Sequence, residues 1–247
     1  MSLISNFDHW KSLNGQHGRQ AFSRFIMLTF LEGLQDTSED FIFKGGNHLW
    51  HYIRTPRETI DLDLATLNIK SHLEVKDFIE KSFKQHHEIS FSIDSFQELD
   101  GVHEVGAGIT ISFSTSSGQR NKFSIDIVYA LPTDIVKIKS TIDGEVRRAA
   151  SIENIICDKL SASQRFKSGN TRMKDFDDLW RIMESGITID TKKLSKLLGE
   201  REIKAHLEME WVGYLENSWK QHVKSYKDIP SSLEDVFVGL NKWLNRL

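Results

Sequence analysis

The chain has 247 residues, ordinary apolar content and a formal net charge of −3, so it can bury the core of one large or two small domains. This near-neutral charge argues against a uniformly basic nucleic-acid coat but leaves room for a local basic groove. Cys157 is the single cysteine, no stretch approaches the roughly 18 apolar residues of a membrane span, and no signal-peptide pattern opens the chain. We therefore expect a soluble protein without disulfides in a reducing cytoplasm.

The first part of the chain mixes helical and strand patterns. Apolar residues at three- and four-residue spacing predict helices at 17–35, 48–53 and 73–86. Short apolar or alternating runs predict strands at 41–43, 60–65, 89–93, 108–115 and 122–130, with two more between 136 and 147. The turn at 116–119 predicts a hairpin between the strands on either side of it.

From Ser151 onward the pattern is helical throughout. Ser151 is a plausible N-cap for the first of these helices, and Gly186 closes the helix that contains Phe176 and Trp180. Further helices are predicted up to residue 198, starting at Asp190 or Thr191, and over 203–223 and 232–247. The sequence thus predicts a mixed α/β core at 1–150 and a helical domain at 151–247.

Asp61 and Asp63 are the first residues with an apparent chemical role. Two residues apart on a strand, their side chains point the same way, about 6.6–6.8 Å apart. Leu62 and Leu64 occupy the other face of this strand. The pair is either a solvated sheet face, because Asp-x-Asp is common, or a pair of cation ligands, because like charges on one face require solvent or a cation.

Two further features favour the second interpretation. Gly45-Gly46 joins a strand to a helix N-terminus, where backbone N–H groups can approach an anion closely, although such pairs are often simple turns. Asp126 lies within an apolar strand, where a charge is costly unless it is exposed, paired or metal-bound. An anion cradle with hard oxygen ligands is what a nucleotide with Mg²⁺ requires, and three carboxylates can hold two such ions.

Lys159 lies inside the apolar stripe of its predicted helix. It either snorkels to solvent or points at an anionic group such as a nucleotide phosphate. Arg165 begins a basic stretch that binds a triphosphate or an RNA backbone, or is an ordinary solvated loop. Asp175 and Asp178 follow this loop, where acids favour a helix N-terminus, and this structural reading is preferred for Asp178.

These residues resemble a known family. Phe43-Lys44-Gly45-Gly46 followed by Arg57-x-Thr59-x-Asp61-Leu62-Asp63 is similar to the first motif of the AbiEii-type nucleotidyltransferases, toxins of type IV toxin–antitoxin systems in the DNA polymerase β-like superfamily. The later stretch with Asp158-Lys159-Leu160, Arg165 and Lys174-Asp175-Phe176-Asp177-Asp178-Leu179 is similar to their second and third motifs. The resemblance covers about residues 40–185. Asn47 departs from it, because the family often has a small hydroxyl residue there.

The resemblance implies a polymerase β-like core with a helical domain, and Mg²⁺-dependent transfer of a nucleoside monophosphate from an NTP. It makes Asp61 and Asp63 the metal ligands, with Asp126 as the superfamily's third carboxylate, and Asp175 a later essential acid rather than a helix-start residue. The residues it places at the nucleotide are Lys44, Gly45, Gly46, Arg57, Thr59, Lys159 and Arg165.

Three functions remain open at this point. The first is transfer to a tRNA 3′ end as a toxin with a cognate antitoxin. The second is transfer to a small molecule or a protein side chain. The third is a nucleotide- or antitoxin-binding module without turnover.

Overall fold

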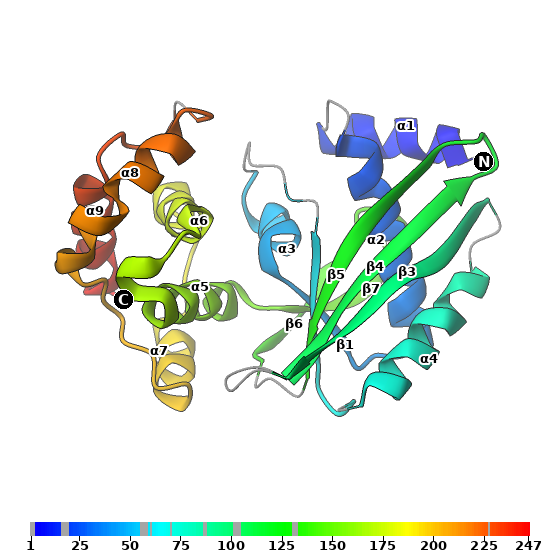
Figure 1. Cartoon of the computed structure of the whole chain (residues 1–247), viewed down its shortest axis with the longest axis horizontal. Helices are drawn as coiled ribbons and strands as arrows, with labels where there is room; N and C mark the ends of the chain where they lie inside the picture. Colours follow the sequence, from blue (N-terminus) through cyan, green and yellow to red (C-terminus); the bar gives the residue numbers. More distant parts are fainter. Residues whose placement is uncertain are drawn as a thin grey trace. The chain divides into compact units, whose positions relative to one another are not determined.

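The computed structural model describes residues 3–15, 20–54, 59, 61–69, 71–85, 88–100, 105–129, 133–226 and 228–247. The chain divides into two compact units (Figure 1). The first unit is built from residues 1–48 and 58–150, and the second from residues 49–57 and 151–247. Each unit has its own hydrophobic core.

Seven strands within the described residues form one sheet in the first unit, in the order β3-β4-β5-β2-β1-β7-β6. They are β1 (Phe41–Lys44), β2 (Asp61–Thr66), β3 (Ile89–Asp100), β4 (Val105–Thr115), β5 (Arg120–Val128), β6 (Ile135–Lys139) and β7 (Val146–Ala150). The pairs β2–β5 and β1–β7 are parallel, and the remaining neighbours are antiparallel. The sheet is therefore mixed, and the predicted hairpin between β4 and β5 is confirmed.

Helices cover one face of this sheet, which we call the core face. These helices are α1 (Leu3–Asn14), α2 (Gln20–Thr37) and α4 (His72–Ser82). The unit also contains the start of α3 (Gly45–Tyr52), whose first turn reaches the opposite face. Phe30 of α2 packs against Phe91 of β3 and Phe123 of β5, with ring centroids 5.4 and 5.6 Å apart. Burying each such ring contributes roughly 1.5–3 kcal/mol. The opposite face of the strands, the outer face, carries the alternate residues, which are mostly polar.

The second unit is a helical bundle. It consists of α5 (Ile152–Phe166), α6 (Met173–Ser185), α7 (Thr191–Glu200), α8 (Val212–Val223) and α9 (Leu233–Leu244), with 3₁₀ turns at Lys167–Gly169 and Met209–Trp211. The caps expected from the sequence are present: Ser151 accepts from the backbone N–H of Asn154, Asp190 caps α7, and Gly186 ends α6 in the left-handed region. No described helix has both the length and the apolar character needed to cross a membrane.

The sequence prediction was wrong in two places. No helix was expected before residue 17, yet α1 forms and buries Trp10, whose indole N–H donates to Thr141 Oγ1 at 3.1 Å. The single helix predicted over 203–223 begins only at Val212. Before it, Leu207 is held in a non-helical segment by Asn241 of α9, which accepts from the Leu207 N–H and donates to the Leu207 carbonyl, both at 2.8 Å. This side chain satisfies the backbone groups that a helix would have used.

Glu32 of α2 makes the first unit sensitive to pH. Its carboxyl is 8% exposed and accepts from Ser140 Oγ, and burial is the largest cause that raises its pKa to about 8. Nearby Asp143 raises the pKa further, whereas the Ser140 hydrogen bond and Arg147 lower it. The folded state therefore holds one more proton than the unfolded state between pH 4.5 and about 8.

We expect the free energy of unfolding to fall as pH rises through this window and to level off above it. The fall is bounded at about 5 kcal/mol, and Glu32→Gln removes it because an amide keeps the Ser140 contact but does not titrate. Urea unfolding at pH 5, 6, 7 and 8 measures this, with exposed Glu88→Gln as the matched control. Equal pH slopes for wild type and Glu32→Gln contradict the prediction.

Candidate active site

Three aspartates meet on the outer face of the sheet. Asp61 and Asp63 alternate along β2 with Leu62 and Leu64, whose side chains are fully buried on the core face. Parallel pairing of β2 with β5 sets Asp126 directly opposite Asp63. One carboxylate oxygen from each of the three aspartates lies within 4.8 Å of those of the other two. The fold thus brings together the three carboxylates that the sequence indicated.

The glycine turn is fitted to Asp63. Gly45 has φ +73°, a left-handed conformation that favours glycine, and a β-carbon there would lie 1.8 Å from Asp63 Oδ2. The backbone N–H of Gly46, in the first turn of α3, donates to the same oxygen at 3.3 Å. A carboxylate at a helix N-terminus is electrostatically favourable. Gly45 and Gly46 therefore hold one of the three carboxylates in place.

The environment of Asp63 raises its pKa. Burial is the largest cause that raises its pKa to about 6, and the nearby charges of Asp61 and Asp126 raise it further. Lys44 lies directly opposite Asp63 on β1, and its charge, like the Gly46 N–H, lowers this pKa. Burial and the two neighbouring carboxylates thus outweigh the lysine and the amide at Asp63.

This donor set fits a divalent cation. Carboxylate oxygens are the ligands that Mg²⁺ prefers, and mutual repulsion between the acids is relieved when a cation binds among them. Asp126 is the most exposed of the three, and Asp61 and Asp63 are half-buried. The trio is therefore held firmly on the β2 side and is open to solvent on the β5 side.

Asn47, where the sequence departs from the family pattern, anchors the turn. Its buried amide donates to the carbonyl of Asp61 at 2.6 Å and to that of Thr59 at 3.4 Å, and its Oδ1 accepts from Arg24 Nε at 3.1 Å. These bonds connect α3 to the chain that enters β2. Asn47 thus takes part in positioning Asp61 through the backbone, a role that a short hydroxyl side chain cannot fill over the same reach.

The structure locates two of the other predicted nucleotide-binding residues. Lys44 lies beside the carboxylates, as its place opposite Asp63 requires. Thr59 is buried, and its carbonyl is held by Asn47. Arg57 and Ile60 of the predicted strand lie outside the described residues. The nucleotide-binding roles of Lys44, Arg57 and Thr59 all remain predictions.

In the second unit, Lys159 of α5 is enclosed rather than solvated. Its side chain is 8% exposed, and its Nζ donates to Asp178 Oδ2 at 2.5 Å and lies 3.5 Å from Asp175 Oδ1. The snorkelling interpretation is therefore wrong. The anionic partner seen in the structure is a pair of aspartates on α6, of which Asp178 is the closer.

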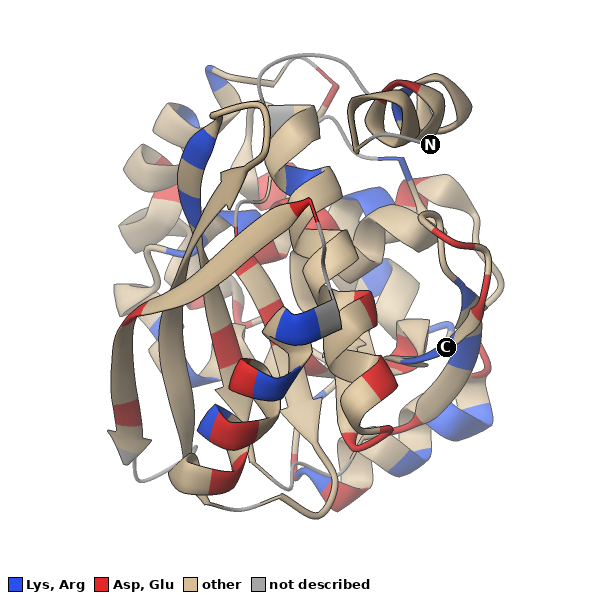
Figure 2. Ribbon diagram, turned by 90° about the vertical axis from the view of Figure 1, so that its right-hand side faces the viewer, with Lys and Arg blue, Asp and Glu red and all other residues tan. Residues whose placement is uncertain are grey.

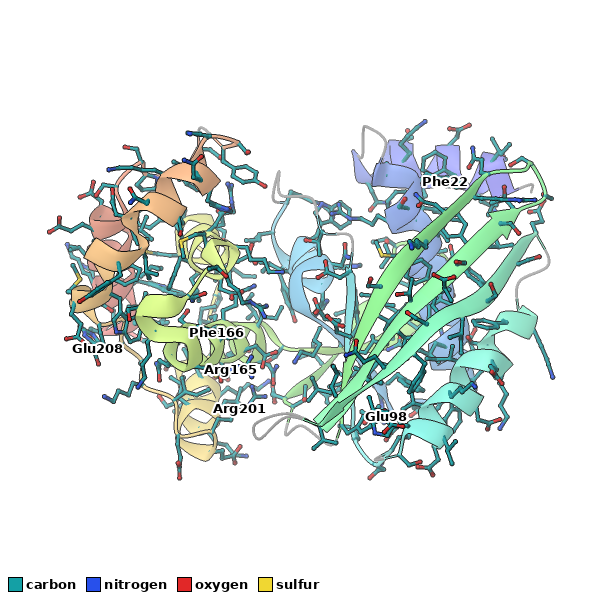
Figure 3. All side chains as sticks on the ribbon, in the orientation of Figure 1. Phe22, Glu98, Arg165, Phe166, Arg201 and Glu208 are labelled. Carbon is teal, nitrogen blue, oxygen red and sulfur yellow. The ribbon has the colours of Figure 1, made fainter. Side chains whose placement is uncertain are left out.

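Asp175 connects this ion pair to a second cation. Its Oδ2 accepts from Arg172 Nε at 3.1 Å, so it lies between Arg172 and Lys159. The structural reading of Asp178 as a helix-start acid understated its role, because Asp178 is fully buried and pairs directly with Lys159. Arg165 is exposed near the end of α5, with its guanidinium 4.9 Å from the ring centroid of Phe166 (Figure 3).

The sequence analysis did not predict two other networks of ion pairs and hydrogen bonds in this unit. Arg201 (Figure 3) donates to Asp158 Oδ1 at 2.6 Å and to Asn154 Oδ1 at 2.7 Å, which ties α7 to α5. Asp177 of α6 accepts from Arg181 Nε at 2.6 Å and lies 2.9 Å from His222 Nε2 of α8. The four-residue spacing of Asp177 and Arg181 was a signal for the second network.

The fold is that of nucleotidyltransferases. A provisionally assigned nucleotidyltransferase from Helicobacter pylori superposes with a TM-score of 0.52 at 14% identity, covering 93% of this chain and 95% of its own. The H. pylori protein JHP933 gives a TM-score of 0.49 at 15% identity, covering 89% of this chain and 88% of its own. At such low identity the likeness concerns the fold alone. A search of curated proteins found no match.

A match between this sequence and a protein-family model identifies the family. The model described as "Nucleotidyl transferase AbiEii toxin, Type IV TA system" matches residues 29–235, which is most of the chain. The chain belongs to this family and is a nucleotidyltransferase. The expected fold class and the resemblance seen in the sequence are both confirmed.

Proposed function

We propose that this nucleotidyltransferase moves a nucleoside monophosphate from an NTP to an acceptor hydroxyl at a tRNA 3′ end, with Mg²⁺ held by Asp61, Asp63 and Asp126. The observation that carries the proposal is the meeting of three carboxylates beside the glycine turn at the start of α3. Type IV toxin–antitoxin membership supports a toxin function controlled by an antitoxin partner.

The chemistry is an in-line displacement at the α-phosphorus. The acceptor oxygen forms the new bond, the bond to the bridging oxygen of the β-phosphate breaks, pyrophosphate leaves, and the acceptor's proton passes to solvent. Bound Mg²⁺ supplies charge stabilisation of the phosphoryl oxygens and alignment of the acceptor. In this chain Asp61 and Asp63 supply a fixed ligand pair, and Asp126 the more accessible third carboxylate.

The remaining residues are assigned by the family resemblance. Lys44, Gly45, Gly46, Arg57, Thr59 and Arg165 are proposed at the nucleotide, and Lys159 at its triphosphate. Asp175 is proposed as the later essential acid, and its contacts with Lys159 and Arg172 fit a residue that orients cations.

The test is transfer from labelled NTPs. Purified protein with Mg²⁺ and total tRNA is expected to label a tRNA band, and a chelator is expected to stop the reaction. Each of the four NTPs is assayed separately, which identifies the donor. Absence of labelled RNA with all four NTPs sinks the proposal.

A small-molecule or protein acceptor is the alternative that the near-neutral charge favours. Salt separates the two cases, because binding to RNA weakens steeply with ionic strength and binding to a small acceptor does not. A module that binds nucleotides without turnover is identified by NTP binding in calorimetry without product.

A further inference from the structure

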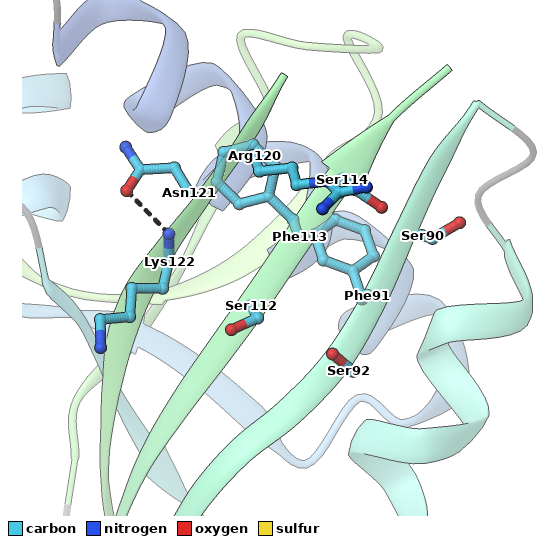
Figure 4. A pocket seen from close by; sticks show the side chains of 9 residues that line it. All are labelled: Ser90, Phe91, Ser92, Ser112, Phe113, Ser114, Arg120, Asn121 and Lys122. Atoms are coloured by element: carbon cyan, nitrogen blue, oxygen red, sulfur yellow. Dashed lines mark hydrogen bonds between the residues drawn. The ribbon is translucent and has the colours of Figure 1, made fainter. Parts of the chain in front are cut away.

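A basic, hydroxyl-lined hollow lies on the outer face of the sheet. It has a volume of about 470 Å³ and spans β3, β4 and β5 (Figure 4). The side chains that matter here are Ser90, Ser92, Ser112, Ser114, Arg120 and Lys122. The register sets them in two rows across the strands, Ser92–Ser112–Lys122 and Ser90–Ser114–Arg120.

Asp126 of the carboxylate trio lies on the same face of β5 as this hollow. Lys122, Ser124 and Asp126 follow one another at two-residue spacing on β5, and all three are exposed on the outer face while the residues between them are buried. At about 3.4 Å per residue, the Lys122 backbone lies about 14 Å from that of Asp126. A chain whose terminal hydroxyl lies at Asp126 can therefore extend along this face.

The side chains suit a phosphate backbone. Arg, Lys, Ser and Asn are the residues that contact phosphates and sugars in nucleic-acid complexes. Phe91 and Phe113 line the hollow but are buried in the core, so the described residues around the hollow offer no exposed ring for stacking of bases. A protein partner favours an aromatic and apolar interface centre instead.

The hollow carries the positive charges of Arg120 and Lys122, whereas the unit as a whole carries residues of both signs (Figure 2). Lys122 Nζ lies 3.8 Å from Asp94 Oδ2, and both side chains are at least half exposed. Such a pair is worth little and exchanges readily for a phosphate. Arg120 is exposed, and no salt bridge is found for it among the described residues.

We propose that the outer face of β3–β5 holds the sugar–phosphate backbone of a single-stranded polynucleotide acceptor, with Arg120 and Lys122 contacting phosphates. The inference rests on the proposed function for its link to catalysis. Because the contacts go to the backbone alone, this surface binds without preference for base sequence.

The test measures binding of a fluorescent single-stranded oligoribonucleotide of mixed sequence, by anisotropy, without NTP, at several salt concentrations. Arg120→Gln/Lys122→Gln is expected to weaken binding at least about tenfold at low salt and to flatten the salt slope by about 1.4, the value for two lost phosphate contacts. Lys76→Gln/Lys81→Gln on α4, two exposed cations on the core-face side, is the matched control and is expected to bind like wild type.

A second variant tests whether removing a negative charge from the surface strengthens oligonucleotide binding. Asp94→Asn removes the carboxylate that competes for Lys122 and is expected to tighten binding by about twofold. Thermal melting of each variant checks that it folds. Unchanged affinity and slope in Arg120→Gln/Lys122→Gln overturn the inference.

Failure of the proposed function gives a different result. Oligonucleotide binding that depends on the two cations, in a wild-type protein that transfers no nucleotide to RNA, supports the surface and overturns the transfer reaction. Transfer to RNA that is equally efficient in wild type and in Arg120→Gln/Lys122→Gln overturns the surface and leaves the transfer reaction standing.

Discussion

Asp61→Asn/Asp63→Asn is expected to lose nucleotide transfer by at least about a thousandfold, because a bound cation supplies several kcal/mol of transition-state stabilisation. The same variant is expected to melt at a higher temperature than wild type in the presence of a chelator. The reason is that Asp63 is partly buried among like charges, which destabilise the fold in the absence of a cation.

Two measurements check the expected loss of activity and the expected gain in stability. Labelled-NTP transfer gives the activity, and melting with and without Mg²⁺ gives the stability. Mg²⁺ is expected to raise the melting temperature of wild type and not of the variant, because only the folded trio binds the ion. Asp8→Asn/Asp77→Asn, which changes two exposed carboxylates, is the control. Nucleotide transfer by Asp61→Asn/Asp63→Asn at a tenth of the wild-type rate contradicts the assignment of these residues as metal ligands.

Lys159→Met is expected to destabilise the protein by about 3–5 kcal/mol, because it leaves Asp178 buried without its cation. Lys159→Met/Asp178→Leu removes both charges and is expected to recover most of this loss, since buried pairs are often replaceable by apolar side chains. Urea unfolding measures both variants. Lys196→Met, which breaks an exposed pair with Glu200, is expected to change stability little.

The double variant also separates the two roles of Lys159. If this lysine contacts the triphosphate, the folded double variant has a strongly raised KM for NTP or no transfer at all. A stable double variant with normal transfer shows that Lys159 serves the helical unit alone. Stability of Lys159→Met equal to wild type contradicts the ion-pair argument instead.

The local features of the site could be predicted from the sequence. Alternation of Asp61 and Asp63 with buried leucines is a property of a few neighbouring residues, and so is the break at Gly45-Gly46. The position of Asp126 opposite Asp63 was not accessible in this way. It depends on the register between two parallel strands that are separated by more than 50 residues, and no local pattern encodes that register.

Partners across helices were missed for a related reason. The sequence marked Lys159 as a charge within an apolar stripe, yet solvent and several acids were equally available partners. Only the packing of α5 against α6 selects Asp178. The helix predicted before α8 was wrong for a different reason. Ile203, Leu207 and Trp211 have helical spacing, but hydrogen bonds with Asn241 hold Leu207 outside a helix.

The backbone of Gly45 lies so close to the Asp63 carboxylate that the residue at one position limits the residue at the other. A side chain at position 45 requires the carboxylate at position 63 to move, so Gly45 cannot change alone without disturbing the arrangement. A relative that keeps the aspartates but replaces this glycine is therefore expected to have lost transfer activity. The identity of this one glycine is then expected to distinguish active from inactive members of the family.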